Sequence, residues 1–210
     1  MARKLILLNG MTPGGRIFKK LLPLIDNYEV LEWIDPVTDS SIQEYAKRIK
    51  REIGDVGECD ILGVSFGGVV AQEVAPLIGA ENCFIVSSIV DPDELNPLHK
   101  TLSHLPLTLV NIGVSSITSF VDSSPMMEGK SPRYRKFFGE KGEWYRWATA
   151  AITSWKPSSV NRDSWIRIHG DADETFKKGH LYSDYVISGA THVLALSHAE
   201  ELSKIIEKYR

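Results

Sequence analysis

The sequence predicts an α/β fold with a mostly parallel sheet of about six strands, helices on both faces, and a small helical cap insertion. Short apolar runs alternate with amphipathic stretches over residues 1–90, and the alternation stops between residues 91 and 155. It then resumes over residues 156–210. We therefore expect one α/β core built from residues 1–90 and 156–210, with residues 91–155 forming a cap over the carboxyl ends of the strands.

Short apolar segments bounded by polar or turn-forming residues are the strand candidates. The first stops at Asn9-Gly10, and the second stops at Asp35-Pro36. Because helical patterns separate most of these segments along the chain, we expect parallel strands joined by helical crossovers. The candidates are Leu5–Leu8, Tyr28–Ile34, Asp60–Val64, Cys83–Ser88, Trp165–His169 and Tyr185–Ile187.

Four segments of the core have apolar residues at helical spacing. Two of them open with a capping-box pattern, which pairs Ser40 with Gln43 and Ser197 with Glu200. The other two are Arg16–Ile25 and Val69–Ile78. The side chains expected to face inward are Ile17, Leu21, Leu24 and Ile25; Ile42, Tyr45, Ala46, Ile49 and Ile53; and Leu202, Ile205 and Ile206.

The insertion is rich in aromatic and sulfur-containing side chains, including Phe120, Met126, Met127, Phe137, Phe138, Trp144 and Trp147. Near its end, Trp144, Trp147, Ala148, Ala151 and Ile152 fall at helical spacing. We expect most of them to pack the cap on the core. Alternatively, one or two of Trp144, Tyr145, Trp147 and Trp155 line an acyl or alcohol pocket.

The composition is typical of a soluble globular protein, with 210 residues, 43% hydrophobic and 24% charged, and a formal net charge of −3. Lysine and arginine do not gather into one long block, which argues against nucleic acid or an anionic membrane as partner. No stretch approaches the roughly 18 apolar residues of a membrane span. The oligomeric state stays open.

The amino-terminal apolar run, Leu5–Leu8, falls short of the roughly 7–15 residues in the apolar core of a signal peptide. We therefore expect a cytoplasmic protein. Cys59 and Cys83 lie next to or inside apolar runs, and a chain of this length needs no disulfide to fold. Both are expected to be buried thiols.

The segment Gly63-Val64-Ser65-Phe66-Gly67 has the G-x-S-x-G pattern between a strand candidate and a helix candidate. A nucleophilic serine in such a turn needs a strained backbone, so that its hydroxyl stands clear of the sheet. Glycines two residues to either side remove Cβ atoms that would clash there. We favour Ser65 as a nucleophile; the alternative is a glycine-rich turn whose serine caps the following helix.

An acid and a histidine follow Ser65 along the chain, each directly after a strand candidate. His169-Gly170-Asp171-Ala172-Asp173 comes after the fifth strand, and Gly189-Ala190-Thr191-His192 comes after the sixth. Because the carboxyl ends of parallel strands meet at one edge of a sheet, these side chains and Ser65 are expected to converge.

These three segments resemble the α/β-hydrolase superfamily, in which serine, acid and histidine occur in this order. The resemblance implies that Ser65 is the nucleophile, His192 the general base and Asp173 the acid of the family's H-G-x-x-D pattern. It also implies an oxyanion hole made by the backbone N–H groups of Phe66 and Met11. Met11 follows Asn9-Gly10, a departure from the commoner His-Gly, and residues 91–155 have no counterpart in the resemblance.

Several single residues have competing interpretations. Asp91 follows the fourth strand and is the alternative acid, whereas Asp171 is expected to be solvated or to hold a turn. His169 is expected to stabilise its turn, and His99, His104, His180 and His198 lack any motif. No metal-ligand spacing, dinucleotide fingerprint or P-loop is present, so we expect neither a metal nor a cofactor.

The sequence therefore predicts a serine hydrolase that cleaves a small carboxylic ester or thioester through an acyl-enzyme, with a carboxylesterase as the preferred form. The same three residues also serve C–C hydrolases and lyases of this superfamily, and an amide substrate is a further alternative. A different class remains open as well: a non-catalytic ligand-binding protein on a hydrolase fold.

Overall fold

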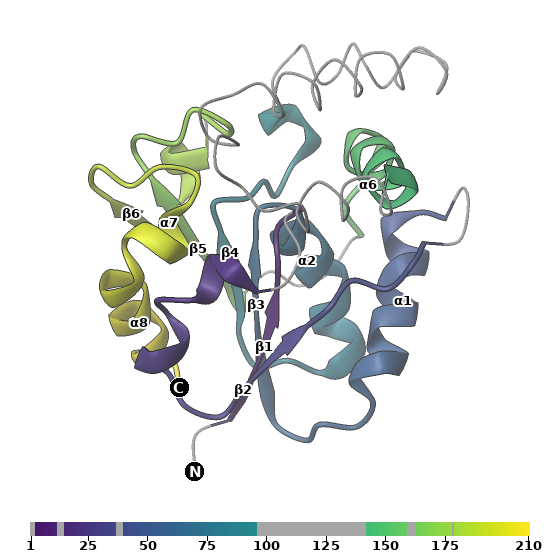
Figure 1. The fold of residues 1–210 in the computed structure, drawn as a ribbon, viewed down its shortest axis with the longest axis horizontal. Coiled ribbons are helices and arrows are strands. Elements are labelled where there is room, and N and C mark those ends of the chain that lie inside the picture. Colours follow the sequence, from purple (N-terminus) through teal and green to yellow (C-terminus); the bar gives the residue numbers. More distant parts are fainter. Residues whose placement is uncertain (1–2, 12–14, 37–39, 96–141, 159–162, 178) are drawn as a thin grey trace, which may run out of the picture.

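The computed structural model describes residues 3–11, 15–36, 40–95, 142–158, 163–177 and 179–210. Its six strands form one sheet in the order β2-β1-β3-β4-β5-β6, and every neighbouring pair is parallel (Figure 1). The predicted α/β class is confirmed. The strands are β1 (Lys4–Leu8), β2 (Tyr28–Leu31), β3 (Cys59–Val64), β4 (Cys83–Val86), β5 (Trp165–Gly170) and β6 (Tyr185–Ile187).

Two strands end earlier than the apolar pattern predicts. The second strand was expected to reach Ile34, but β2 is an edge strand whose only partner, β1, ends at the pair Leu8↔Leu31. The fourth strand was expected to reach Ser88, but Ser87 has a positive φ of 46°. This conformation turns the chain out of the ladder directly after Val86.

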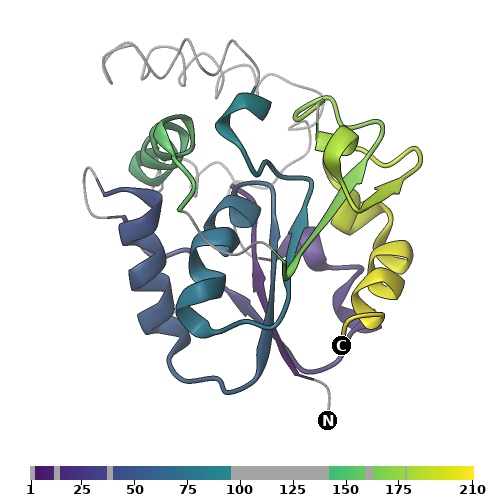
Figure 2. The same cartoon turned by 180° about the vertical axis from the view of Figure 1, so that it is seen from behind.

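Helices cover both faces of the sheet, as the sequence predicts (Figures 1 and 2). One face carries α1 (Ile42–Ile53), α2 (Phe66–Ile78) and α6 (Gly142–Ser154), and the other carries the short 3-10 helices η1 (Arg16–Phe18) and η2 (Leu22–Leu24) with α7 (Leu194–Ser197) and α8 (Ala199–Glu207). Alternate residues of β1 enter the two cores, Ile6 and Leu8 on the α2 side and Leu5 and Leu7 on the α8 side.

Helix α1 begins one residue later than its predicted capping box. Ser41 and Glu44 form that box, since the Ser41 hydroxyl accepts from the Glu44 N–H at 3.2 Å and the Glu44 carboxylate accepts from the Ser41 N–H at 2.9 Å. The side chain of Gln43 bonds instead to Glu73 and to the Lys156 carbonyl. The inward-facing residues predicted for this helix are all buried.

The predictions at the two chain ends need correction. Segment 16–25 is not one helix but the two turns η1 and η2, because Pro23 lacks the N–H that a continuous helix needs. Leu24 is 39% exposed, and Phe18 is fully buried in this core. At α8, the predicted Ser197–Glu200 box is also wrong, since His198 occupies the N-cap without a side-chain bond. Leu202, Ile205 and Ile206 are buried as predicted.

The structure describes only the two ends of the predicted cap, the 3-10 helix η3 (Pro92–Glu94) and helix α6. The predicted positions Phe120, Met126, Met127, Phe137 and Phe138 lie outside the described residues, and the cap boundaries stay a prediction. Helix α6 packs on the core as expected, with Trp144, Trp147, Ala148, Ala151 and Ile152 buried. The segment after α6 is held by buried Glu73 of α2, which accepts from the Trp155 indole at 2.8 Å and the Ser158 hydroxyl at 2.6 Å.

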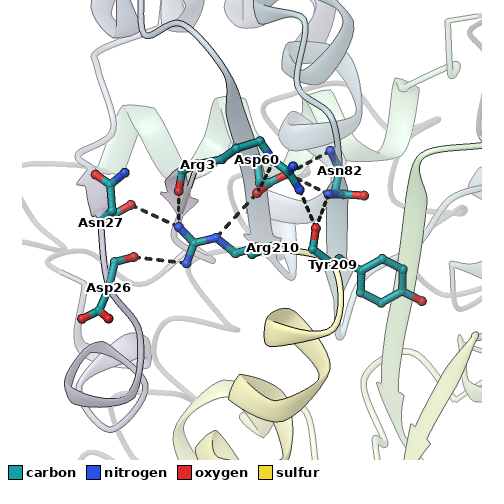
Figure 3. Close-up of polar contacts among 7 residues, drawn as sticks. All are labelled: Arg3, Asp26, Asn27, Asp60, Asn82, Tyr209 and Arg210. Carbon is teal, nitrogen blue, oxygen red and sulfur yellow. Dashed lines mark hydrogen bonds and ion pairs between the residues drawn. The ribbon is translucent and has the colours of Figure 1, made fainter. Parts of the chain in front are cut away.

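A charged cluster ties the amino ends of β1 and β3 to the C-terminal residues (Figure 3). Asp60 of β3 is fully buried, and its carboxylate accepts from the Arg3 guanidinium at 3.1 Å and from the Asn82 amide at 2.8 Å. Arg210 lies 3.5 Å from the same carboxylate and donates to the carbonyls of Arg3 and Asp26. Burial lowers the pKa of Arg210, and Asp60 opposes that shift.

We expect Asp60→Asn to lower the free energy of unfolding by about 3 kcal/mol, because it removes the buried carboxylate that pairs with both the Arg3 and the Arg210 guanidinium groups. Urea denaturation measures the change. Glu29→Ala is the matched control, since Glu29 pairs with Lys4 on the surface at 43% exposure, and exposed pairs contribute less than about 1 kcal/mol. Equal decreases in the free energy of unfolding for Asp60→Asn and Glu29→Ala would contradict this account of the cluster.

Candidate active site

Ser65 is the single residue between β3 and α2, and its backbone is strained. Its φ of 55° and ψ of −121° lie in a region that costs a non-glycine residue roughly 1–3 kcal/mol. Hydrogen bonds hold it there: the Ser65 N–H donates to the Val86 carbonyl at 2.9 Å, and the Ser88 hydroxyl donates to the Ser65 carbonyl at 2.6 Å. The predicted strand-to-helix elbow is therefore present.

The glycines of the elbow are required by close backbone contacts. A Cβ on Gly63 would lie 2.1 Å from the Gly67 carbonyl oxygen. A Cβ on Gly67 would lie 2.2 Å from the Asn9 carbonyl oxygen. Real side chains do not occupy such distances, so helix α2 can start directly above β1 and β3 only with glycine at these positions.

The hydroxyl of Ser65 does not cap α2, although Ser65 occupies the N-cap position. It lies 2.9 Å from Nε2 of His192, which stands on the loop between β6 and α7. The alternative interpretation of Ser65 as a helix cap is therefore wrong. His192 is 26% exposed and packs edge-on against the Phe176 ring at a centroid distance of 5.3 Å.

Asp173 completes a continuous chain of side chains. Its Oδ2 lies 2.9 Å from Nδ1 of His192, and its Oδ1 accepts from the backbone N–H groups of Thr175 and Phe176 at 2.8 Å and 3.2 Å. A carboxylate only accepts hydrogen bonds, so Nδ1 carries the proton of the neutral imidazole. Nε2 is then the acceptor for the hydroxyl of Ser65.

The pKa of Asp173 is held well below its ordinary value, although the carboxyl is buried. Burial alone would raise this pKa. The hydrogen bonds from His169 and His192, the charge of His192 and the Phe176 N–H lower it by more. Asp173 is thus an anion at neutral pH, placed to orient His192 and to stabilise its cation.

His169 lies closer to the site than the sequence suggests. It is fully buried, and its Nε2 lies 3.0 Å from the same Oδ2 of Asp173 that contacts His192. The expectation that His169 only stabilises its turn overlooked this contact. The H-G-x-x-D spacing is the sequence feature that indicates this contact, because it places a histidine at the end of β5 four residues before the acid.

The two competing aspartates have other partners. Asp171 accepts from the Gly189 N–H at 2.7 Å and from the Ser188 hydroxyl at 3.2 Å, so it holds the turn before His192, as expected. Asp91 is exposed, and its carboxylate accepts from the Asp93 N–H at 2.7 Å at the start of η3. Both ring nitrogens of His192 are already within 2.9 Å of Ser65 and Asp173.

The backbone groups expected to form the oxyanion hole lie on both sides of Ser65. Phe66 is the first residue of α2, where a helix leaves its N–H groups without partners in the helix. Met11 follows Gly10 at the end of β1, and a Cβ on Gly10 would lie 3.4 Å from Cβ of Ser65. The loop that carries Met11 therefore runs against the serine.

Two side chains hold this loop from the side of β2. The buried amide of Asn9 donates to the Leu31 carbonyl at 3.2 Å, and the Trp33 indole donates to the Gly10 carbonyl at 2.9 Å. Sequence reasoning did not single out Trp33, since it fell within an apolar segment assigned to a strand. No sequence signal marks its hydrogen bond.

The described residues also bear on metal binding, on the two cysteine thiols and on membrane spanning. Within the part of the chain that the structure describes, no three His, Cys, Asp or Glu side chains are grouped to hold a metal ion. Cys59 and Cys83 are buried free thiols, as predicted, and burial raises the pKa of both. None of the described helices is long and apolar enough to span a membrane.

No protein-family model matches the sequence, and a comparison with curated proteins gives no match. Solved structures are similar in fold. A thermophilic esterase from Thermogutta terrifontis superposes with a TM-score of 0.70 at 15% identity, over 100% of this chain and 89% of the esterase. An α/β hydrolase from the sediment metagenome of the Mar Chica lagoon gives 0.62 at 13% identity, over 100% and 90%.

The NocB thioesterase domain, solved as a covalent complex with a fluorophosphonate nocardicin G analogue, gives a TM-score of 0.61 at 18% identity, over 100% of this chain and 95% of the domain. The structure thus has the α/β-hydrolase fold that the sequence predicts. At these identities the likeness establishes the fold alone.

The lowered pKa of Asp173 predicts how stability depends on pH. A carboxyl whose pKa is lower in the folded than in the unfolded state stabilises the fold above its unfolded pKa, here 3.8. That contribution is lost as the pH falls through the folded pKa. Between about pH 5 and pH 2, wild-type stability should therefore fall more steeply than that of Asp173→Asn, measured by urea denaturation. If the free energies of unfolding of the wild type and Asp173→Asn changed equally with pH, the lowered pKa of Asp173 would be contradicted.

Proposed function

We propose that this protein is a serine hydrolase that cleaves a small carboxylic ester or thioester through an acyl-enzyme intermediate. One observation carries the proposal: Ser65, His192 and Asp173 form an unbroken chain with both contacts at 2.9 Å. The sequence places these residues up to 127 positions apart. Their convergence beside a strained elbow is the geometry that nucleophilic catalysis by serine requires.

In the first half of the reaction, Nε2 of His192 takes the proton of Ser65 while Oγ attacks the carbonyl carbon. The carbonyl oxygen becomes an oxyanion, and the backbone N–H groups of Phe66 and Met11 are the proposed donors to it. When the tetrahedral intermediate collapses, the bond to the alcohol or thiol breaks. The leaving group receives the proton from His192, and the acyl group stays on Ser65.

In the second half, His192 takes a proton from water, and the hydroxide attacks the acyl carbon. The bond to Oγ breaks, His192 returns the proton to Ser65, and the carboxylic acid leaves. Asp173 stays ionised throughout, since its pKa lies well below neutral pH. His192 thus accepts and returns the proton in each step of the proposed reaction.

The fold neighbours support esters and thioesters as the substrate class, because they include an esterase and a thioesterase domain. Among these activities we favour a carboxylesterase acting on a small-molecule substrate without a cofactor. Turnover of p-nitrophenyl esters of increasing acyl length, compared with the matching thioesters, would define the preferred acyl group and leaving group.

Ser65→Ala should abolish labelling by a fluorophosphonate probe and lower ester turnover by more than about 1,000-fold, because it removes the hydroxyl that lies 2.9 Å from Nε2 of His192. Mass spectrometry of the labelled wild type locates the adduct, and Ser203→Ala, which removes a buried hydroxyl on α8, is the matched control. Turnover retained by Ser65→Ala would rule out this nucleophile. A stable wild type that neither reacts nor turns over any ester would favour a binding protein.

The assignment of the acid is tested by two aspartates of the same loop. Asp173→Asn should lower kcat by roughly 1,000- to 10,000-fold, because the amide favours the wrong tautomer of His192. Asp171→Asn should cause a much smaller loss, since Asp171 bonds only to the turn before His192. If Asp91→Asn instead gave the larger loss, the alternative acid would be correct.

A further inference from the structure

We propose that Trp33 positions the oxyanion hole: its indole N–H fixes the peptide group between Gly10 and Met11, so that the Met11 N–H faces the nucleophile. The inference rests on the proposed function, and it assigns a role to a side chain that carries no catalytic motif. Trp33 is a positioning residue, because it acts on the reaction only through the backbone that it holds.

The order of the strands places Trp33 and Ser65 around Gly10. β1 lies between β2 and β3 in the sheet, so the segments that leave the ends of β2 and β3 lie on opposite sides of the segment that leaves β1. Trp33 follows β2 by two residues, and Ser65 directly follows β3. The backbone at Gly10 therefore has the indole on one side and the nucleophile on the other.

Peptide geometry then sets the direction of the Met11 N–H. The carbonyl of Gly10 and the N–H of Met11 belong to one planar trans peptide and point in opposite directions. The Trp33 indole N–H donates to the Gly10 carbonyl oxygen at 2.9 Å, which directs that oxygen toward the β2 side. The N–H of Met11 must then point toward the β3 side, where Ser65 stands.

The ladder of the sheet does not fix this peptide. The register of β1 ends at Leu8, which pairs with Leu31 of β2 and Gly63 of β3. Gly10 lies two residues further on and has no Cβ that could limit rotation. The hydrogen bond from Trp33 supplies the restraint that the ladder no longer provides.

Trp33 itself is held firmly. Its ring contacts the Phe66 ring at a centroid distance of 5.6 Å with a T-shaped geometry, and the Trp144 ring at 5.6 Å. Phe66 is the residue proposed to supply the second N–H of the oxyanion hole. One side chain thus contacts both parts of the proposed oxyanion hole, the Gly10 carbonyl through its N–H and the Phe66 ring through its own ring.

The bond also strengthens the Met11 N–H as a donor. A hydrogen bond accepted by the carbonyl of a peptide polarises the N–H of that same peptide, and a partly dry environment increases the effect. A phenylalanine at position 33 would fill much of the same space but would neither hold the carbonyl nor polarise the N–H. The indole N–H is thus the specific group to remove.

The test compares Trp33→Phe with Tyr45→Phe. Tyr45 packs against Trp33 at a ring distance of 6.1 Å, and its hydroxyl donates to the Ile34 carbonyl at 2.7 Å. Both variants therefore lose one donor to a backbone carbonyl in the same aromatic cluster, and Tyr45→Phe also removes the acceptor of the Trp144 indole at 3.3 Å, but only Trp33→Phe frees the Gly10 carbonyl. The readouts are kcat and KM for a p-nitrophenyl ester, and the inhibition constant of an aryl trifluoromethyl ketone, whose serine adduct carries an oxyanion.

Trp33→Phe should lower kcat by about 10-fold or more, with KM changed less than about twofold. The variant would weaken the hydrogen bond to the oxyanion of the transition state and leave binding of the ester itself unchanged. Binding of the trifluoromethyl ketone should weaken by the same factor as kcat/KM. Tyr45→Phe should change each of these quantities less than about twofold. Incorporation of 3-benzothienylalanine at position 33 keeps the two-ring shape without the N–H and should reproduce Trp33→Phe even if the phenylalanine variant folds poorly.

A Trp33→Phe variant with unchanged kcat, or one whose kcat falls while ketone binding stays the same, would overturn the inference. Equal losses of kcat and of ketone binding in Trp33→Phe and Tyr45→Phe would also overturn it, because they would indicate that Trp33 acts only through packing. Fluorophosphonate labelling of the wild type separates this result from failure of the proposed function. A labelled and active wild type with an unaffected Trp33→Phe variant contradicts the role of Trp33 alone, whereas an unlabelled wild type contradicts both.

Discussion

The close approach of three backbone segments around Ser65 is the constraint on which the rest of the structure depends. Helix α2 begins so near β1 and β3 that Gly63 and Gly67 have no room for a Cβ atom. This approach places the start of α2 and the segment that follows β1 next to Ser65. It also forces Ser65 into a strained conformation, which three hydrogen bonds to its backbone maintain. The backbone strain thus falls on the residue proposed as the nucleophile.

The loops at the carboxyl edge of the sheet position the other side chains of the candidate site. Asp173 and His192 follow neighbouring strands, β5 and β6, and Asp171 joins their two loops by accepting from Gly189. Asp173 has donors on both oxygens, which keeps an anion stable in a buried position. The opposite edge has the charged cluster around Asp60 (Figure 3). Asp60 lies at the amino end of β3, whereas Ser65 follows the carboxyl end of that strand. The charges that hold the two chain ends together therefore lie apart from the Asp173 carboxylate that contacts His192.

Local sequence signals predicted the strands and the convergence of Ser65, His192 and Asp173 well, because each is encoded within a few positions. A strand appears as a short apolar run, and the elbow as glycines two residues from Ser65. The errors occurred where a neighbour in space decides the outcome. The second apolar segment ends as a strand at Leu31 because its partner β1 ends there. Ser41 displaces Ser40 as the cap of α1, a choice between two registers that both fit the pattern.

The contacts of Trp33 and His169 illustrate the same limit. Each makes one contact with a residue on another strand or loop, the first with the Gly10 carbonyl and the second with Asp173. The first contact depends on the order of strands in the sheet, which the sequence does not state, whereas the second joins residues four positions apart on one segment. The spacing within H-G-x-x-D gave a partial signal for His169, but nothing local distinguishes Trp33 from any other apolar residue at the end of an edge strand.

The most direct measurement of the central claim is a crystal structure of the protein after reaction with diethyl p-nitrophenyl phosphate. The account predicts phosphorus bonded to Oγ of Ser65, with the phosphoryl oxygen at roughly 3 Å from the backbone nitrogens of both Phe66 and Met11. His192 should remain in contact with Asp173. An adduct on another residue, or a phosphoryl oxygen turned away from those two nitrogens, would contradict the account.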